Sequence, residues 1–175
     1  MCRWCPVNSS VQQAYETPWS HVRAVERDSF GGVPFVLDAA ATLANRKADR
    51  HYDTSTNGLS SPWIDGTWCN PPYEHQGDWL ARAVYWARQG MHSASLVLAS
   101  TSAKYWRPCA HEAGTIDYYE GRIAFVDPAT GQPRPNFDRA SALVLLGPRF
   151  RSGVVRYRDA RSGELIGRTD QISLL

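Results

Sequence analysis

The chain reads Thr67-Trp68-Cys69-Asn70-Pro71-Pro72-Tyr73 somewhat before its midpoint. Thr67–Cys69 has the short, apolar character of a buried strand. The two prolines that follow cannot donate to a strand ladder, so the strand must end at Asn70. In open α/β sheets, ligands bind in the crevice beyond the carboxyl ends of the strands. The segment therefore predicts a sheet with a polar side chain, Asn70, at its ligand-binding edge.

Strand and helix signals alternate on both sides of this segment. The spacing of apolar residues predicts a helix around Trp79 to Ala87, closed by Gly90. Upstream, Thr17 is expected to cap a helix whose first residue is Pro18. The other expected elements are the end of that helix near 28, a strand over 34–37 that ends at Asp38, a helix-forming stretch over 39–47, turns over 51–66, strands over 95–100, 116–119, 122–126 and 142–146, a helical piece near 102–113, and a hairpin of 154–158 with 164–168. This order predicts an α/β protein whose open mixed sheet finishes with antiparallel strands.

Length and composition are those of one folded domain. The 175 residues are 43% hydrophobic and 21% charged, which is typical of a globular protein. Residues 1–16 are polar and show no sustained period, so we expect a flexible N-terminal tail followed by a single domain over 17–175. No apolar run approaches the roughly 18 residues of a membrane span. The first residues lack the apolar core of a secretory signal, and we therefore expect a cytoplasmic protein.

Arginine is concentrated near the C-terminus although the formal net charge of the chain is only +2. A net charge of this size neither demands nor excludes a polyanionic partner. The cluster is interpreted either as a basic face that contacts phosphates or as the solvated surface of a hairpin. Its members are Arg149, Arg151, Arg156, Arg158 and Arg161.

The cysteines are interpreted as reduced thiols rather than as a metal site. Cys2 and Cys5, together with Cys109 and His111, would offer four soft ligands. The first pair, however, lies in a segment without other signs of order, and the second spacing is unusual. Cys69 lies in a short apolar run and is expected to be a small buried hydrophobic residue. We therefore expect no metal.

The run Asn70-Pro71-Pro72-Tyr73 is similar to the catalytic motif of S-adenosylmethionine-dependent amino methyltransferases that act on adenine N6. More of the chain resembles one branch of these enzymes, the small phage and prophage DNA N6-adenine methyltransferases of the Dam type. The resemblance implies a Rossmann-like class I methyltransferase fold, S-adenosylmethionine as cofactor, and adenine in double-stranded DNA as substrate. The pieces that match in order are Thr17-Pro18, Leu37-Asp38-Ala39-Ala40, Ala44-Asn45, Tyr52, Gly58-Leu59, Trp63, the segment ending at Tyr73, the helix of Trp79, and Gly121-Arg122-Ile123-Ala124-Phe125 on to about Gly147.

By this resemblance, Asn70, Pro71, Pro72 and Tyr73 form the catalytic site. Adenine N6 is a poor nucleophile because its lone pair is delocalised into the ring. The carboxamide oxygen of Asn70 and the backbone carbonyl of Pro71 would each accept one amino hydrogen and stabilise positive charge as it develops. Proline offers a carbonyl without a competing N–H. Tyr73 would present a flat face to a base that has left the duplex stack.

The cofactor site lacks the Gly-rich loop that usually follows the first strand of a dinucleotide-type fold. By resemblance, Asp38, Ala39 and Asn45 line the methionine or ribose end of the cofactor, and Thr17 with Pro18 contacts its methionine moiety. Asp38 and Thr17 also have a purely structural interpretation, because either can cap a helix.

Asn57 departs from the branch, which generally has aspartate before Gly58-Leu59. An amide in place of a carboxylate removes an acceptor, and this puts recognition of the ribose or adenine ring by Asn57 in doubt. Three other functions stay open. RNA-adenine and protein-glutamine methyltransferases use similar tetrapeptides, although the glutamine enzymes generally bring a Gly-rich loop and an N-terminal helical domain. The missing Gly-rich loop and Asn57 favour a non-catalytic phage DNA-binding accessory protein.

Overall fold

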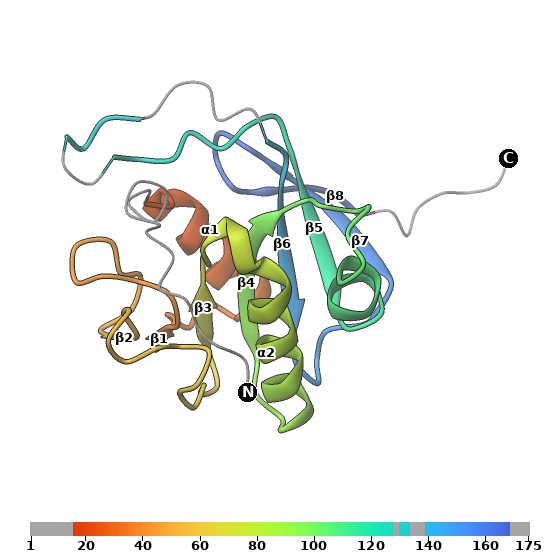
Figure 1. Ribbon diagram of the computed structural model, residues 1–175. Coiled ribbons are helices and arrows are strands. Elements are labelled where there is room, and N and C mark those ends of the chain that lie inside the picture. The colour runs from red at the N-terminus through yellow and green to blue at the C-terminus, as the bar shows by residue number, and fades with distance from the viewer. Residues whose placement is uncertain (1–15, 128–129, 134–138, 169–175) are drawn as a thin grey trace, which may run out of the picture.

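The computed structural model describes residues 16–127, 130–133 and 139–168, and its centre is an eight-stranded sheet (Figure 1). The order of strands across the sheet is β2-β1-β3-β4-β6-β5-β7-β8. The strands are β1 (Leu37–Asp38), β2 (Arg50–His51), β3 (Thr67–Cys69), β4 (Ser93–Leu98), β5 (Thr115–Glu120), β6 (Ser141–Leu146), β7 (Val154–Asp159) and β8 (Leu165–Arg168).

Most strands of the sheet point the same way. β1 is parallel to both β2 and β3, and β3 is parallel to β4. β6 is antiparallel to its neighbours β4 and β5, which makes those two parallel to each other. β7 is parallel to β5, and β8 runs back along β7. Every strand except β6 and β8 therefore ends at one edge of the sheet, the carboxyl edge.

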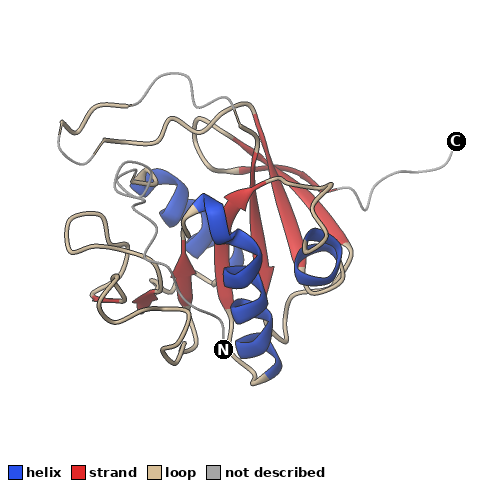
Figure 2. Cartoon of the chain, in the orientation of Figure 1, coloured by secondary structure: helices blue, strands red, loops and turns tan. Residues whose placement is uncertain are grey.

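The two longest helices cover opposite faces of the sheet (Figure 2). α1 (Trp19–Ser29) buries Val22 and Val25 in a core that includes Leu143 of β6. α2 (Gln76–Arg88) buries Leu80 in a second core that includes Val144, the next residue of β6. Successive side chains of a strand point to opposite faces, so this alternation places one helix on each side. The remaining helical pieces are a 3₁₀ turn (Tyr73–His75) and a π-helical turn (Arg107–His111).

The predicted α/β class and mixed sheet are confirmed. β3 has the predicted bounds, and β7 and β8 form the predicted antiparallel hairpin. The buried tryptophans Trp63, Trp79 and Trp106 belong to the core, as does Cys69. No helix within the described ranges is long and apolar enough to cross a membrane.

The strand predicted over 34–37 is limited to β1, Leu37–Asp38. Two other predicted elements are wrong for identifiable reasons. The stretch 39–47 forms turns rather than a helix. Its backbone is drawn into other bonds, since Ala41 N donates to Tyr52 O at 3.0 Å and Lys47 N donates to Asp38 Oδ2 at 2.9 Å. The stretch 122–126 forms no strand, and within it only Val126 forms bridges, to Glu16 and Pro133. Both sides of β5 are already paired, one with β6 and the other with β7, so this stretch cannot pair with β5.

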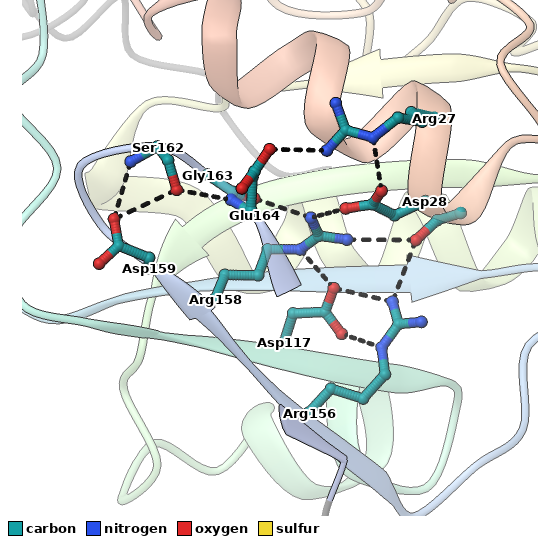
Figure 3. Close-up of polar contacts among 10 residues, drawn as sticks. Arg27, Asp28, Asp117, Arg156, Arg158, Asp159, Ser162, Gly163 and Glu164 are labelled. Atoms are coloured by element: carbon teal, nitrogen blue, oxygen red, sulfur yellow. Dashed lines mark hydrogen bonds and ion pairs between the residues drawn. The ribbon is translucent and has the colours of Figure 1, made fainter. Parts of the chain in front are cut away.

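A buried ion-pair network joins α1 to β5 and β7 on the face that α1 covers (Figure 3). The Asp117 carboxylate accepts from Arg156 Nε at 2.6 Å and from Arg158 Nε at 2.6 Å. Arg158 also donates to Asp28 Oδ2 at 3.1 Å, and both arginines donate to the hydroxyl of Ser29. Neither interpretation of the arginine cluster holds for Arg156 and Arg158, which are buried inside the protein.

Candidate functional site

The site lies at the carboxyl edge, where β1 and β3 end side by side. Asp38 is the last residue of β1 and is in register with Trp68 of β3. The next backbone group, Ala39 N, donates to Trp68 O at 2.9 Å. Asn70 follows β3 directly. The sheet thus brings the ends that carry Asp38 and Asn70 together.

Residues Glu16 and Thr17 cross this edge and connect its parts. Asn70 Nδ2 donates to Thr17 Oγ1 at 3.2 Å. The backbone of Glu16 pairs with Val126, in the long segment between β5 and β6, with N···O distances of 2.8 and 2.9 Å. The Glu16 carboxylate forms an ion pair with the buried ammonium of Lys47. One short segment therefore contacts the tetrapeptide, the loop after β1 and the segment after β5.

Thr17 does not cap α1, in contrast to the prediction. The residue at the N-cap position is Pro18, and no side chain of the described residues caps this helix. Pro18 is half-buried beside Thr17. The Thr17 hydroxyl is used instead by Asn70, which is far away in the sequence, so local capping rules could not have found this contact.

Asp38 is a buried carboxylate that organises the loop after β1. Its side chain accepts from Ala40 N at 3.3 Å and from Lys47 N at 2.9 Å. Burial raises its pKa to about 6, although these backbone donors and the Lys47 charge oppose the rise. Asp38 therefore closes the loop 39–47 and caps no helix. Ala39 is buried next to it.

Asn45 and Asn57 shape the two loops that flank the end of β1. Asn45 Oδ1 accepts from Thr42 N at 2.7 Å and from the Thr42 hydroxyl at 3.0 Å. Asn57 has a φ of 48°, in the left-handed region that asparagine tolerates better than β-branched residues do. Its Oδ1 accepts from Leu59 N. Gly58 follows, and a Cβ there would lie 2.0 Å from Ala39 O. The loop of Asn57 therefore packs directly on Ala39.

The tetrapeptide is partly exposed at the same edge. Pro71 is buried, whereas Asn70, Pro72 and Tyr73 are half-buried. Burial raises the pKa of the Tyr73 phenol well above its usual range, and the positive charge of Arg139 opposes this rise. Tyr73 is consequently a neutral phenol at neutral pH, and Arg139 lies close enough to act on it.

Sequence reasoning missed four residues of this edge. Glu16 and Lys47 form the ion pair described above, and Arg139 lies near Tyr73. Gln76, at the start of α2, is buried, and its Oε1 accepts from Leu98 N at the end of β4 at 3.2 Å. Gln76 Nε2 has no hydrogen-bond partner among the described residues. The partners of these residues are distant in sequence, so no local pattern marks them.

Comparison with known proteins identifies the family of this chain. The family model of the DNA N-6-adenine-methyltransferases (Dam) matches residues 6–165 of the chain. The chain belongs to this family. The predicted resemblance to the phage Dam-type branch is thereby confirmed.

A phage protein is among the relatives of this Dam family member. The chain is similar to the DNA N-6-adenine-methyltransferase of Escherichia phage T1, with 23% identity over 154 residues. The aligned part covers 78% of this chain and 63% of the phage T1 protein. The chain thus spans less than two thirds of the length of that relative.

The described part of this Dam family member contains no group of three or more histidine, cysteine, aspartate or glutamate side chains placed to hold a metal ion. Cys69 is buried among apolar side chains, and its thiol pKa is raised well above the ordinary value by burial. Cys109 is half-buried. Cys2 and Cys5 lie outside the described residues.

Proposed function

We propose that this protein transfers a methyl group from S-adenosylmethionine to the N6 amino group of adenine in double-stranded DNA. The observation that carries the proposal is the placement of Asn70 at the carboxyl edge with its amide nitrogen bound to Thr17. In this orientation the donor end of the amide is occupied and the acceptor end, Oδ1, faces away from Thr17. Membership of the Dam family supports adenine in DNA as the target.

The fold supports this assignment. We infer a Rossmann-like class I methyltransferase fold from an open and mostly parallel sheet, with helices on both faces. Ligands of such sheets bind beyond the carboxyl ends of the strands. The proposed catalytic and cofactor residues all lie at or just after the ends of β1, β2 or β3 or in the segment of Thr17 that crosses them.

In the proposed reaction, Asn70 Oδ1 and the carbonyl of Pro71 accept the two hydrogens of the adenine amino group. Two such acceptors favour a pyramidal nitrogen whose lone pair is no longer delocalised into the ring. They also stabilise the positive charge that develops on this nitrogen. The Pro71–Pro72 turn holds the carbonyl rigidly. The neutral phenol ring of Tyr73 provides a stacking surface for a base that has been extruded from the duplex.

The proposed cofactor site consists of the loops after β1 and β2, and the segment of Thr17 and Pro18 lies beside it. S-adenosylmethionine, when bound, supplies the methyl group. The donor set fits such a molecule, because Asp38 brings a buried negative charge to the loop after β1, where a cationic ligand would bind. Asn45 and Asn57 would offer their amide nitrogens to ribose hydroxyls, since their Oδ1 atoms already accept from Thr42 and Leu59. Both oxygens of Asp38 already accept backbone N–H groups, so its part is to hold the loop 39–47 in shape and to contribute charge.

The substrate class is tested by offering labelled S-adenosylmethionine with unmethylated duplex DNA, RNA and a release-factor protein in parallel. We expect N6-methyladenine in the nucleosides of the duplex only, identified by mass spectrometry. Label in RNA or in glutamine would replace the proposal by one of the two alternative enzymes. Failure of the protein to bind S-adenosylmethionine in a calorimetric titration would favour a non-catalytic DNA-binding role.

A further inference from the structure

The hydroxyl of Thr17 is held in a rigid and enclosed position. The residue is only 1% exposed. Its neighbour Glu16 is fixed through its backbone to Val126 and through its carboxylate to Lys47. On the other side, Pro18 is the N-cap residue of α1. The hydroxyl therefore has little freedom to follow a moving partner.

The polar contact of this hydroxyl is made with Asn70, 53 residues away, whose Nδ2 donates to Thr17 Oγ1 at 3.2 Å. A carboxamide has a donor end and an acceptor end, and a rotation of half a turn exchanges them. A hydroxyl has two acceptor lone pairs, so it can receive the Asn70 N–H while its own hydrogen turns elsewhere.

We propose that Thr17 is a positioning residue that holds the Asn70 amide in place, an inference that rests on the proposed function. With Nδ2 bound to Thr17, Oδ1 is the end of the amide that remains for the adenine amino group. In the reversed orientation two NH2 groups would face each other, and neither could accept. The bond to Thr17 therefore holds the amide in place with Nδ2 occupied and Oδ1 left to accept a hydrogen from the target nitrogen.

This role differs from the direct contact with the cofactor that the family resemblance implies for Thr17. A cofactor contact would act on the affinity for S-adenosylmethionine whatever residue stands at position 70. A positioning role would act on turnover and only through the Asn70 amide. The two roles therefore separate in a comparison of kcat with cofactor affinity.

The test is a double-mutant cycle of Thr17→Val and Asn70→Ala, with Thr17→Ser as the conservative variant. Valine has nearly the shape of threonine and lacks the hydroxyl. We expect Thr17→Val to lower kcat by about ten- to a hundredfold, as for a misplaced catalytic group, and to leave the Kd for S-adenosylmethionine unchanged. Thr17→Ser should restore most of the turnover. In the Asn70→Ala background, Thr17→Val should have no further effect.

Wild-type turnover in Thr17→Val, an equal loss in both backgrounds, or a weakened cofactor affinity would each overturn the positioning role. Thr17→Ala provides a second hydroxyl-free variant if Thr17→Val does not fold, as judged by its thermal melt. Inactivity of the wild-type protein on duplex DNA would overturn the proposed function itself, and this outcome is distinct because it appears before any variant is compared.

Discussion

His21 is a buried histidine without a hydrogen-bond partner for Nδ1 among the described residues. Its ring lies against Tyr119, with 5.5 Å between the ring centroids, and close to the backbone of Gly163. Burial, assisted by the positive charge of Arg158 and opposed by Asp159, lowers its pKa to about 4. His21 is therefore neutral in the folded protein at any pH at which the protein is expected to work.

This lowered pKa predicts a loss of stability in acid. Between pH 6.5 and pH 4 the unfolded chain takes up a proton at His21 that the folded protein excludes, so the free energy of unfolding falls as the pH falls. The loss amounts to about 3 kcal/mol across this range. His21→Phe keeps an aromatic ring against Tyr119 but cannot titrate. Urea denaturation at pH 7 and pH 4 should show a smaller fall for this variant than for wild type, and equal falls would contradict the account of His21.

At the scale of elements, the ion-pair network of Asp117, Arg156 and Arg158 fixes α1 to the sheet. Asp117 and Arg158 are both fully buried. Removal of one partner from a buried pair leaves the other charge without compensation, and this costs far more than loss of an exposed pair. Since α1 begins directly after Thr17 and Pro18, the network also supports the segment that contacts Asn70.

Asp117→Ala leaves two buried guanidinium groups without their shared carboxylate. We expect the free energy of unfolding to fall by about 3–5 kcal/mol. Arg151→Ala serves as the control, because Arg151 is an exposed arginine of the same C-terminal cluster, and surface changes of this kind usually stay within about 0.5 kcal/mol. Chemical denaturation of the two variants measures the difference. Equal stability of the two variants would show that the network contributes little.

The sequence predicted elements where a strong local signal coincided with the tertiary environment. α2, β6 and the β7–β8 hairpin are examples, since their apolar patterns match the faces they bury. It failed over 39–47, where helix-forming residues are held in turns by the Asp38 carboxylate and by a bond to Tyr52. It also failed for β2, a two-residue strand with no apolar pattern. In the first case, contacts between distant residues override a local preference. In the second, no local signal exists and the strand is defined only by its pairing with β1.

The residues of the candidate site also divide into those with a strong local sequence signal and those defined by contacts between distant segments. Asn70 and the prolines were predicted because the tetrapeptide itself is distinctive. Thr17 was predicted as a site residue because Thr17-Pro18 matches the family, but its contact with Asn70 depends on how the segment before α1 meets the end of β3. Arg156 and Arg158 look like surface arginines in the sequence, and only the position of Asp117 on the adjacent strand explains why they are buried.

At the scale of the whole molecule, two exposed arginines, Arg139 and Arg151, lie at opposite edges of the sheet. Arg139 immediately precedes Ala140, whose carbonyl accepts from Ala99 N just beyond the carboxyl end of β4 at 2.9 Å. Arg151 lies at the other edge, where its carbonyl accepts from Thr115 at the start of β5 at 3.0 Å. Only the first of these arginines lies at the edge that carries Tyr73 and Asn70.

This placement predicts that Arg139, in contrast to Arg151, contacts a DNA phosphate. Arg139→Ala should weaken duplex binding and reduce the slope of log affinity against log salt concentration by about one. Arg151→Ala, with the same loss of charge at the opposite edge, should leave the slope unchanged. Fluorescence anisotropy titrations at several salt concentrations measure both slopes. An equal change in the two variants would indicate a non-specific effect of net charge and would refute the assignment to Arg139.

The measurement that bears most directly on the central claim is the turnover of Asn70→Ala on duplex DNA with S-adenosylmethionine. Glu74→Ala provides the matched control, because Glu74 is an exposed residue that follows Tyr73 directly. We predict that Asn70→Ala lowers the rate of N6-methyladenine formation by about a hundredfold or more, since an acceptor at the developing charge is lost, while its affinity for S-adenosylmethionine and the activity of Glu74→Ala stay at wild-type values. Methylation by Asn70→Ala at the wild-type rate would contradict the account.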